Sequence, residues 1–77
     1  MQLELLTPDK VLFQGEVTSV SLPGTLGRFQ ILNNHAALVS SLTKGEVVVE
    51  LADKSSETFE IEGGILEILN NRAVVLA

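Results

Sequence analysis

Few side chains in this sequence could carry out chemistry, and their spacing is not that of a catalytic site. Most acidic residues fall at alternate, outward positions of predicted strands, as at Glu46, Glu50, Glu60 and Glu62. Two carboxylates can flank a bond as general acid and base, so a small hydrolase is one hypothesis. A solvated acidic face that discourages edge pairing is the better interpretation, because a catalytic site needs its titratable groups in a cleft.

The single histidine, His35, follows an asparagine pair and has no nucleophile or acid at a spacing known from catalytic motifs. We interpret it as a structural or contact residue. The absence of cysteine excludes disulfides, thiolate nucleophiles and sulfur-ligated metals, and one histidine cannot form a histidine-rich metal site. The glycines open no helix and precede no Lys-Ser/Thr, so they form no phosphate loop. The sequence therefore predicts no catalytic residue, no metal and no cofactor.

One lysine supports an alternative. Lys54 lies after Asp53 at the tip of a predicted hairpin in an acidic, all-β chain. This resembles a lipoyl-carrier domain, in which a tip lysine bears the cofactor. The resemblance covers only residues 49–55, and a lysine in a polar loop is common. A lipoyl carrier with Lys54 as the attachment site is the alternative hypothesis.

Length and charge exclude several classes of function. The chain has 77 residues and 45% hydrophobic content, which predicts a single domain over residues 1–77. Its net charge is −5 and its basic residues are scattered, which argues against nucleic acid and anionic lipid as partners. No apolar run approaches the roughly 18 residues of a membrane span, and no signal peptide is visible. We expect a cytoplasmic location.

Short runs of alternating apolar residues indicate strands, and no segment has a helical period. An imperfect alternation at Val17-Thr18 suggests a bulge. The predicted strands span residues 2–7, 11–13, 16–22, 29–32, 37–42, 46–51, 58–62, 65–69 and 73–77. The predicted fold is all-β: an antiparallel β-sandwich or flattened barrel of about 8–10 short strands.

Turn signals separate these strands, and three of them fall in or beside residues 22–38. Pro23-Gly24 suits the central positions of a type II turn, and Gly27 frees the backbone again. Asn33-Asn34 predicts a second turn because asparagine tolerates the left-handed region. Asn70-Asn71 has type I′ character. A compact segment of this kind, held at both ends, is a plausible docking surface.

Motifs along the whole chain resemble the epsilon subunit of F-type ATP synthases. The matching stretches are Leu-Thr-Pro-Asp-Lys at 6–10, Leu-Phe-Gln-Gly-Glu-Val at 12–17, Ser-Leu-Pro-Gly at 21–24, Gly-Arg-Phe-Gln-Ile-Leu at 27–32, His-Ala-Ala-Leu at 35–38, Phe-Glu-Ile-Glu-Gly-Gly at 59–64 and the closing strand at 71–77. The chain departs from the family where Asn-Asn-His-Ala-Ala-Leu at 33–38 replaces the usual Pro-Gly-His-Ala-Pro-Leu. Gln30 replaces a usual glycine, and Arg28 a usual neutral or acidic residue.

The resemblance implies a non-catalytic rotor subunit of the central stalk. Such a subunit would bind the gamma subunit and the membrane c-ring, couple proton flow to ATP synthesis, and bind neither a small-molecule substrate nor lipid directly. It would lie at the cytoplasmic face of the bacterial inner membrane. The helical hairpin that follows this domain in many members would be missing, and with it the inhibitory extension and the nucleotide sensing.

The resemblance also implies which residues meet the partners. Carried over by motif, one set would face the c-ring: Gly24, Thr25, Leu26, Gly27 and Arg28. A second set would lie near gamma and the ring: His35, Ala36, Ala37 and Leu38. The small side chains of the second set would let a partner backbone approach closely.

Overall fold

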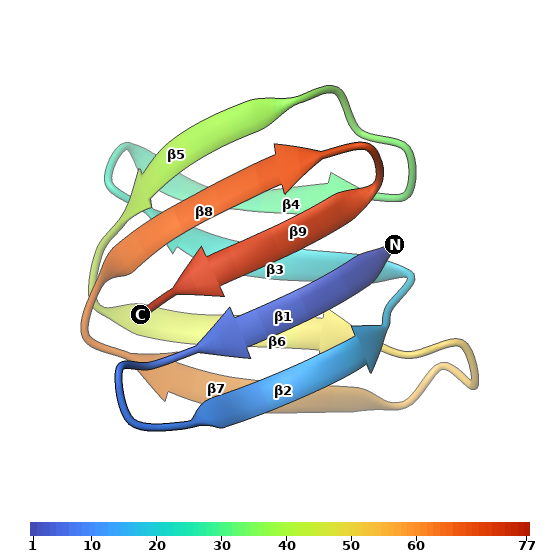
Figure 1. Cartoon of the computed structure of the whole chain (residues 1–77), viewed down its shortest axis with the longest axis horizontal. Coiled ribbons are helices and arrows are strands. Elements are labelled where there is room, and N and C mark those ends of the chain that lie inside the picture. Colours follow the sequence, from blue (N-terminus) through green and yellow to red (C-terminus); the bar gives the residue numbers. More distant parts are fainter.

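The computed structural model describes residues 1–77 and consists of nine strands without a helix (Figure 1). The strands are β1 (Gln2–Leu6), β2 (Val11–Glu16), β3 (Ser19–Gly24), β4 (Gly27–Leu32), β5 (Leu38–Leu42), β6 (Gly45–Glu50), β7 (Ser56–Ile61), β8 (Gly64–Leu69) and β9 (Arg72–Leu76). The predicted all-β fold is confirmed. No element is a helix long and apolar enough to cross a membrane.

The strands form two layers, which Figure 1 shows one in front of the other. The front layer has the order β2-β1-β9-β8-β5, and the back layer has the order β4-β3-β6-β7. The layers join at one corner, where Gly24 of β3 pairs with Leu42 of β5. Pairing is antiparallel except between β1 and β9, which are parallel. The parallel pair is possible because almost the whole chain connects these two strands, so no tight hairpin fixes their direction.

The side opposite that corner is closed by aromatic packing. The sheet order ends at β2 and β7, and these two strands are not hydrogen-bonded to each other. Phe13 of β2 and Phe59 of β7 meet edge to face, with ring centroids 5.9 Å apart and an interplanar angle of 61°. Edge-to-face contact is a preferred geometry for aromatic pairs. The two rings therefore cover the open side of the core.

The core lies between the layers and follows the predicted alternation. In β6, Val47 and Val49 are fully buried while Glu46 and Glu50 are exposed. Fifteen buried apolar residues form one cluster. Each fully buried Val or Leu contributes about 1.5–3 kcal/mol, so this cluster is the main source of stability.

The predicted type II turn at Pro23-Gly24 is wrong. Both residues are buried in β3, and Gly24 pairs with Gly27, which leaves Thr25 and Leu26 as a two-residue loop. The positive φ lies at Gly27, at 130°, instead of Gly24. Proline lacks a backbone N–H, and on the side away from β4 the strand β3 has no paired residue at Pro23, because its pairing with β6 stops at Ser21. The turn is therefore displaced by two residues along the hairpin.

The predicted strand over residues 16–22, with a bulge at Val17-Thr18, is also wrong. β2 continues to Glu16, β3 begins at Ser19, and the two residues between them carry the chain from the front layer to the back layer. Val17 is buried, and Thr18 donates its backbone N–H to Glu50 O at 2.8 Å. The broken alternation marks this crossing, because the inward direction reverses between layers.

The two predicted asparagine turns are confirmed. Asn34 has φ 62°, in the left-handed region that asparagine tolerates. Asn70 and Asn71 have φ 52° and 60°, and two successive positive values define the type I′ hairpin turn. This turn fixes the β8–β9 register, with Leu69 opposite Arg72.

Candidate partner-binding surfaces

The residues that the sequence predicts as partner contacts lie at opposite ends of β4 (Figure 1). Residues 25–26 connect β3 to β4 at one end of the sandwich, and residues 33–37 connect β4 to β5 at the other. Six strand residues at about 3.3 Å each place the two ends roughly 20 Å apart. The predicted contact set therefore forms two separate surfaces.

The first surface is the β3–β4 tip, residues 25–27. Leu26 is the most exposed large apolar residue of the chain, at 103%. Thr25 fixes the tip to β5, because its N–H donates to Ser41 O at 3.2 Å and its Oγ1 lies 3.0 Å from Ser41 Oγ. The tip thus presents an apolar side chain on an anchored loop.

The two residues that flank the tip differ in their roles. Gly24 is buried, and a Cβ on it would lie 2.7 Å from Gly27 O and from the Phe29 ring. It allows the hairpin to close and offers little surface to a partner. Arg28 is exposed, and its Nη2 donates to Ser21 Oγ at 3.0 Å. Its charge is not paired with any acid within ion-pair distance.

The second surface is the β4–β5 loop, residues 33–37. His35, Ala36 and Ala37 are exposed, and Leu38 begins β5 with its half-buried side chain packed against the core. Nδ1 of His35 lies 2.8 Å from Ala36 O and donates to it. The small alanine side chains leave the backbone here open to close approach by a partner.

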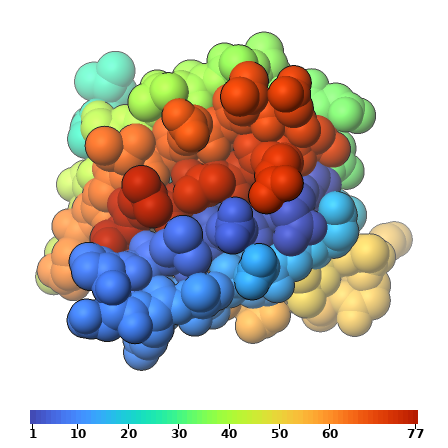
Figure 2. All heavy atoms as spheres, viewed as in Figure 1, coloured from blue at the N-terminus to red at the C-terminus, as the bar shows by residue number.

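A third surface, which sequence reasoning missed, lies on the outer face of the front layer. Four residues are neighbours across β8, β9, β1 and β2, because the register pairs each with the next: Ile65, Leu76, Leu6 and Val11. We call them the apolar row. Ile65, Leu76 and Val11 are 50%, 56% and 56% exposed. Figure 2 shows this face, where the atoms of β9 and β1 form one continuous surface.

A contiguous apolar surface of this kind is typical of a site that binds another protein. The sequence carried one signal for it. Apolar residues occupy both faces of a strand at Leu5-Leu6 and at residues 74–76, where a half-solvated strand would alternate. The signal was not decisive, because it does not say which outward residues become neighbours.

The acidic residues do not form a catalytic pair in a cleft. Glu46, Glu50, Glu60 and Glu62 are all exposed, and Glu46 lies opposite Glu60 in the β6–β7 pair. No group of three His, Asp or Glu side chains is placed to hold a metal ion. The geometry therefore offers the hydrolase hypothesis no support.

The β6–β7 loop contains the one carboxyl group with a clear pKa shift. Asp53 Oδ1 accepts hydrogen bonds from Ser55 Oγ at 2.5 Å and Ser55 N at 3.0 Å. These bonds, the side-chain one first, lower the pKa of the Asp53 carboxyl. Lys54 beside it has φ 70° and is exposed. The aspartate therefore shapes the turn, and exposure is the only property that supports Lys54 as an attachment site.

One shallow hollow opens on the front layer. Its volume is about 220 Å³, and it is lined by Glu67, Leu69, Asn70, Arg72 and Val74. Ligand pockets usually hold about 300–1,000 Å³ and enclose most of the ligand. Arg72 already has an acidic neighbour, with its Nη2 3.8 Å from Glu4 Oε1. The hollow is a shallow surface depression between exposed side chains.

Comparisons with known proteins identify the fold and the family. The chain is 48% identical over 75 residues to the ATP synthase epsilon chain of Chlorobium limicola, covering 97% of this chain and 85% of that one. Among solved structures, it superimposes with a TM-score of 0.91 and 21% identity on a chain of the Euglena gracilis mitochondrial ATP synthase OSCP/F1/c-ring structure. It does so with a TM-score of 0.83 and 17% identity on a chain of the Tetrahymena thermophila central stalk/c-ring structure.

The structural matches show a shared fold. They cover 97% of this chain in both cases but only 48% and 60% of the two solved chains, so this chain spans about half of each. The family model for the beta-sandwich domain of the ATP synthase delta/epsilon chain matches residues 1–77. With a match over its whole length, the chain belongs to the ATP synthase delta/epsilon chain family, as its beta-sandwich domain.

Proposed function

We propose that this domain links the gamma subunit to the c-ring in the central stalk of a proton-translocating ATP synthase, and so couples proton flow to ATP synthesis. The observation that carries the proposal is the presence of separate exposed surfaces on one rigid sandwich. A subunit that connects two partners needs two such surfaces. The solved chains with this fold come from an OSCP/F1/c-ring assembly and from a central stalk/c-ring assembly.

The chain is a non-catalytic subunit, because the epsilon chain carries no catalytic site of the synthase. The family match includes the hairpin that contains Lys54, so it replaces the lipoyl-carrier alternative. The domain would act mechanically, by transmitting torque through its contacts. We place it at the cytoplasmic face of the bacterial inner membrane, held there through the complex.

We assign the surfaces to partners by their chemistry. The apolar row crosses four strands of the front layer, and desolvated apolar anchors dominate stable protein interfaces. It suits the gamma subunit. The β3–β4 tip is narrow, with Leu26 standing out from a two-residue loop, and it suits insertion between the loops of the c-ring. The β4–β5 loop lies at the other end of the front-layer strands from the row, beside the start of β1, and we assign it to the gamma subunit from the family resemblance alone.

The test uses two purified partners and two variants. The chain is titrated against the cognate gamma subunit and against detergent-solubilised c-ring. Leu26→Asp is expected to weaken c-ring binding at least tenfold and leave gamma binding unchanged, since burying an unpaired charge is costly. Ala37→Trp is expected to weaken gamma binding, because its bulk blocks close approach.

Both changed residues are exposed, so melting temperatures are expected to stay near that of the unmodified chain. Ala52→Asp, in the exposed β6–β7 loop, is the control for added charge. The proposal fails if the unmodified chain forms no complex with gamma at micromolar concentrations. The assignment of surfaces fails if the variants affect both partners equally.

A further inference from the structure

The β4–β5 loop is not held by the backbone. It has no strand pairing, and none of the nine backbone hydrogen bonds outside the strands involves residues 33–37. His35 bonds only to its own neighbour, Ala36. A five-residue exposed segment without such bonds has many accessible conformations, so something else must fix it.

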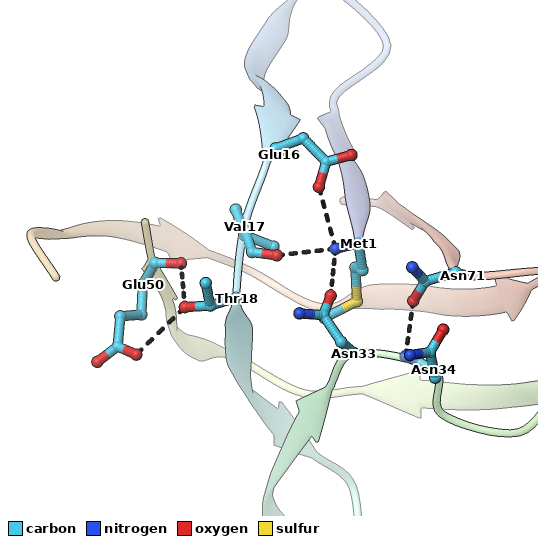
Figure 3. A network of polar contacts seen from close by, with 8 residues as sticks. All are labelled: Met1, Glu16, Val17, Thr18, Asn33, Asn34, Glu50 and Asn71. Atoms are coloured by element: carbon cyan, nitrogen blue, oxygen red, sulfur yellow. Dashed lines mark hydrogen bonds and ion pairs between the residues drawn. The ribbon is translucent and has the colours of Figure 1, made fainter. Parts of the chain in front are cut away.

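Two polar contacts from other parts of the chain fix it, as Figure 3 shows. The α-ammonium group of Met1 donates to Asn33 Oδ1. The backbone N–H of Asn34 donates to Asn71 Oδ1 at 2.7 Å. We call these two contacts the latch. They hold adjacent residues of the loop from two different places in the front layer, the start of β1 and the β8–β9 turn.

Both anchoring residues are themselves fixed. The Met1 ammonium also donates to Val17 O at 2.9 Å and to Glu16 Oε2 at 3.1 Å, and the Met1 side chain is buried in the core. Asn71 accepts the Gln2 N–H with its backbone oxygen at 3.1 Å and lies in the two-residue type I′ turn. The latch therefore connects the loop to residues that are themselves hydrogen-bonded into the front layer.

We propose that the latch positions the β4–β5 loop for its partner, with Asn71 and Asn33 as positioning residues. This rests on the proposed function for its binding part only. A binding surface that is populated only part of the time lowers the apparent affinity by that fraction. Holding residues 35–37 in one conformation before the partner arrives removes that loss.

The chain offers a matched pair of variants. Asn71→Gly removes the acceptor and yields Asn-Gly, the most favourable type I′ sequence, so the turn itself does not weaken. Asn70→Gly changes the neighbouring turn residue, which also has positive φ but has no side-chain hydrogen bond to the loop. Asn71→Asp keeps an acceptor oxygen at the same place and should rescue the contact.

The first measurement is amide hydrogen exchange at Asn34 in the isolated chain, followed by NMR. We expect Asn71→Gly to raise the exchange rate of that amide at least tenfold, and Asn70→Gly and Asn71→Asp to leave it near the original rate. Asn33→Ala is expected to raise the Asn34 exchange rate by a smaller factor, because it removes only the contact that holds the adjacent residue. An Asn34 amide that stays equally protected in Asn71→Gly overturns the latch.

The second measurement is affinity for the cognate gamma subunit. Asn71→Gly is expected to bind gamma about five- to tenfold more weakly than Asn70→Gly, because its loop is no longer preorganised. The two variants are expected to have the same melting temperature. If the exchange rate rises but the affinities are equal, the latch exists and does not position the loop for gamma. If the unmodified chain binds no gamma at all, the proposed function fails, while the exchange experiment still decides whether the latch exists.

Discussion

At the scale of single residues, two glycines show how closely the backbone packs. Gly64 has φ 144°, and a Cβ on it would lie 2.2 Å from Leu76 O, a backbone atom that cannot move aside. Gly27 has φ 130° but no heavy atom within 4 Å of the same position. Both need glycine for their dihedral angle, and only Gly64 needs it for space as well.

Alanine substitution at these two glycines separates the two costs. Gly27→Ala is expected to lower the free energy of unfolding by about 1–2 kcal/mol, from backbone strain alone. Gly64→Ala is expected to lower the free energy of unfolding by about 1–3 kcal/mol more than Gly27→Ala does, because its Cβ also clashes with β9. Urea unfolding of both variants in parallel measures the difference. Equal losses would contradict the close approach of Gly64 to Leu76.

At the scale of elements, the least supported boundary of the sandwich is the side between β2 and β7. No backbone hydrogen bonds join these strands, so Phe13 and Phe59 close that side by side-chain contact alone. Removing a fully buried phenylalanine costs about 3–5 kcal/mol. Phe59 is only half-buried, so Phe59→Ala is expected to cost less, about 2–3 kcal/mol by the same measure.

A double-mutant cycle tests whether the two rings act together. Phe13→Leu and Phe59→Leu are expected to couple by about 0.5–1.5 kcal/mol, the range for an edge-to-face aromatic pair. Phe29→Leu provides the control, because Phe29 lies on β4 and is not stacked on either ring. Thermal and urea unfolding supply the free energies. Additive losses at Phe13 and Phe59 would mean that the burial of each ring, and not the contact between the two rings, stabilises this side of the sandwich.

The elements also show what the sequence could and could not predict. Alternation predicted β6 with its inward Val47 and Val49, and paired asparagines predicted the turn at Asn70-Asn71, because both signals are local. The predicted turn at Pro23-Gly24 was wrong because a Pro-Gly dipeptide fits both the central positions of a turn and the end of a strand. What decides against it is the pairing of Gly24 with both Gly27 and Leu42, a tertiary contact.

At the scale of the whole molecule, the candidate surfaces were predictable only where they are continuous in sequence. The β3–β4 tip and the β4–β5 loop are short segments with recognisable composition. The apolar row joins Leu6 to Leu76, which are neighbours only because β1 pairs in parallel with β9. No local pattern encodes that register. The separation of the two predicted segments to opposite ends likewise follows from the direction of β4.

The apolar row gives the final prediction. Leu76→Lys places a charge in the centre of the row, where a protein partner would have to desolvate it. Association with gamma is expected to weaken at least tenfold, or about 1.4 kcal/mol. Binding is measured by titration calorimetry. The domain is expected to stay folded, because the side chain is already 56% exposed.

Thr58→Lys is the control, since Thr58 is exposed and lies on β7, in the other layer and away from the β4–β5 loop. The two variants carry the same added charge at exposed positions on opposite layers. A partner that covers the front layer must distinguish them. Equal affinities for the two variants would show that gamma binds elsewhere, and would leave the row as exposed apolar surface without an assigned partner.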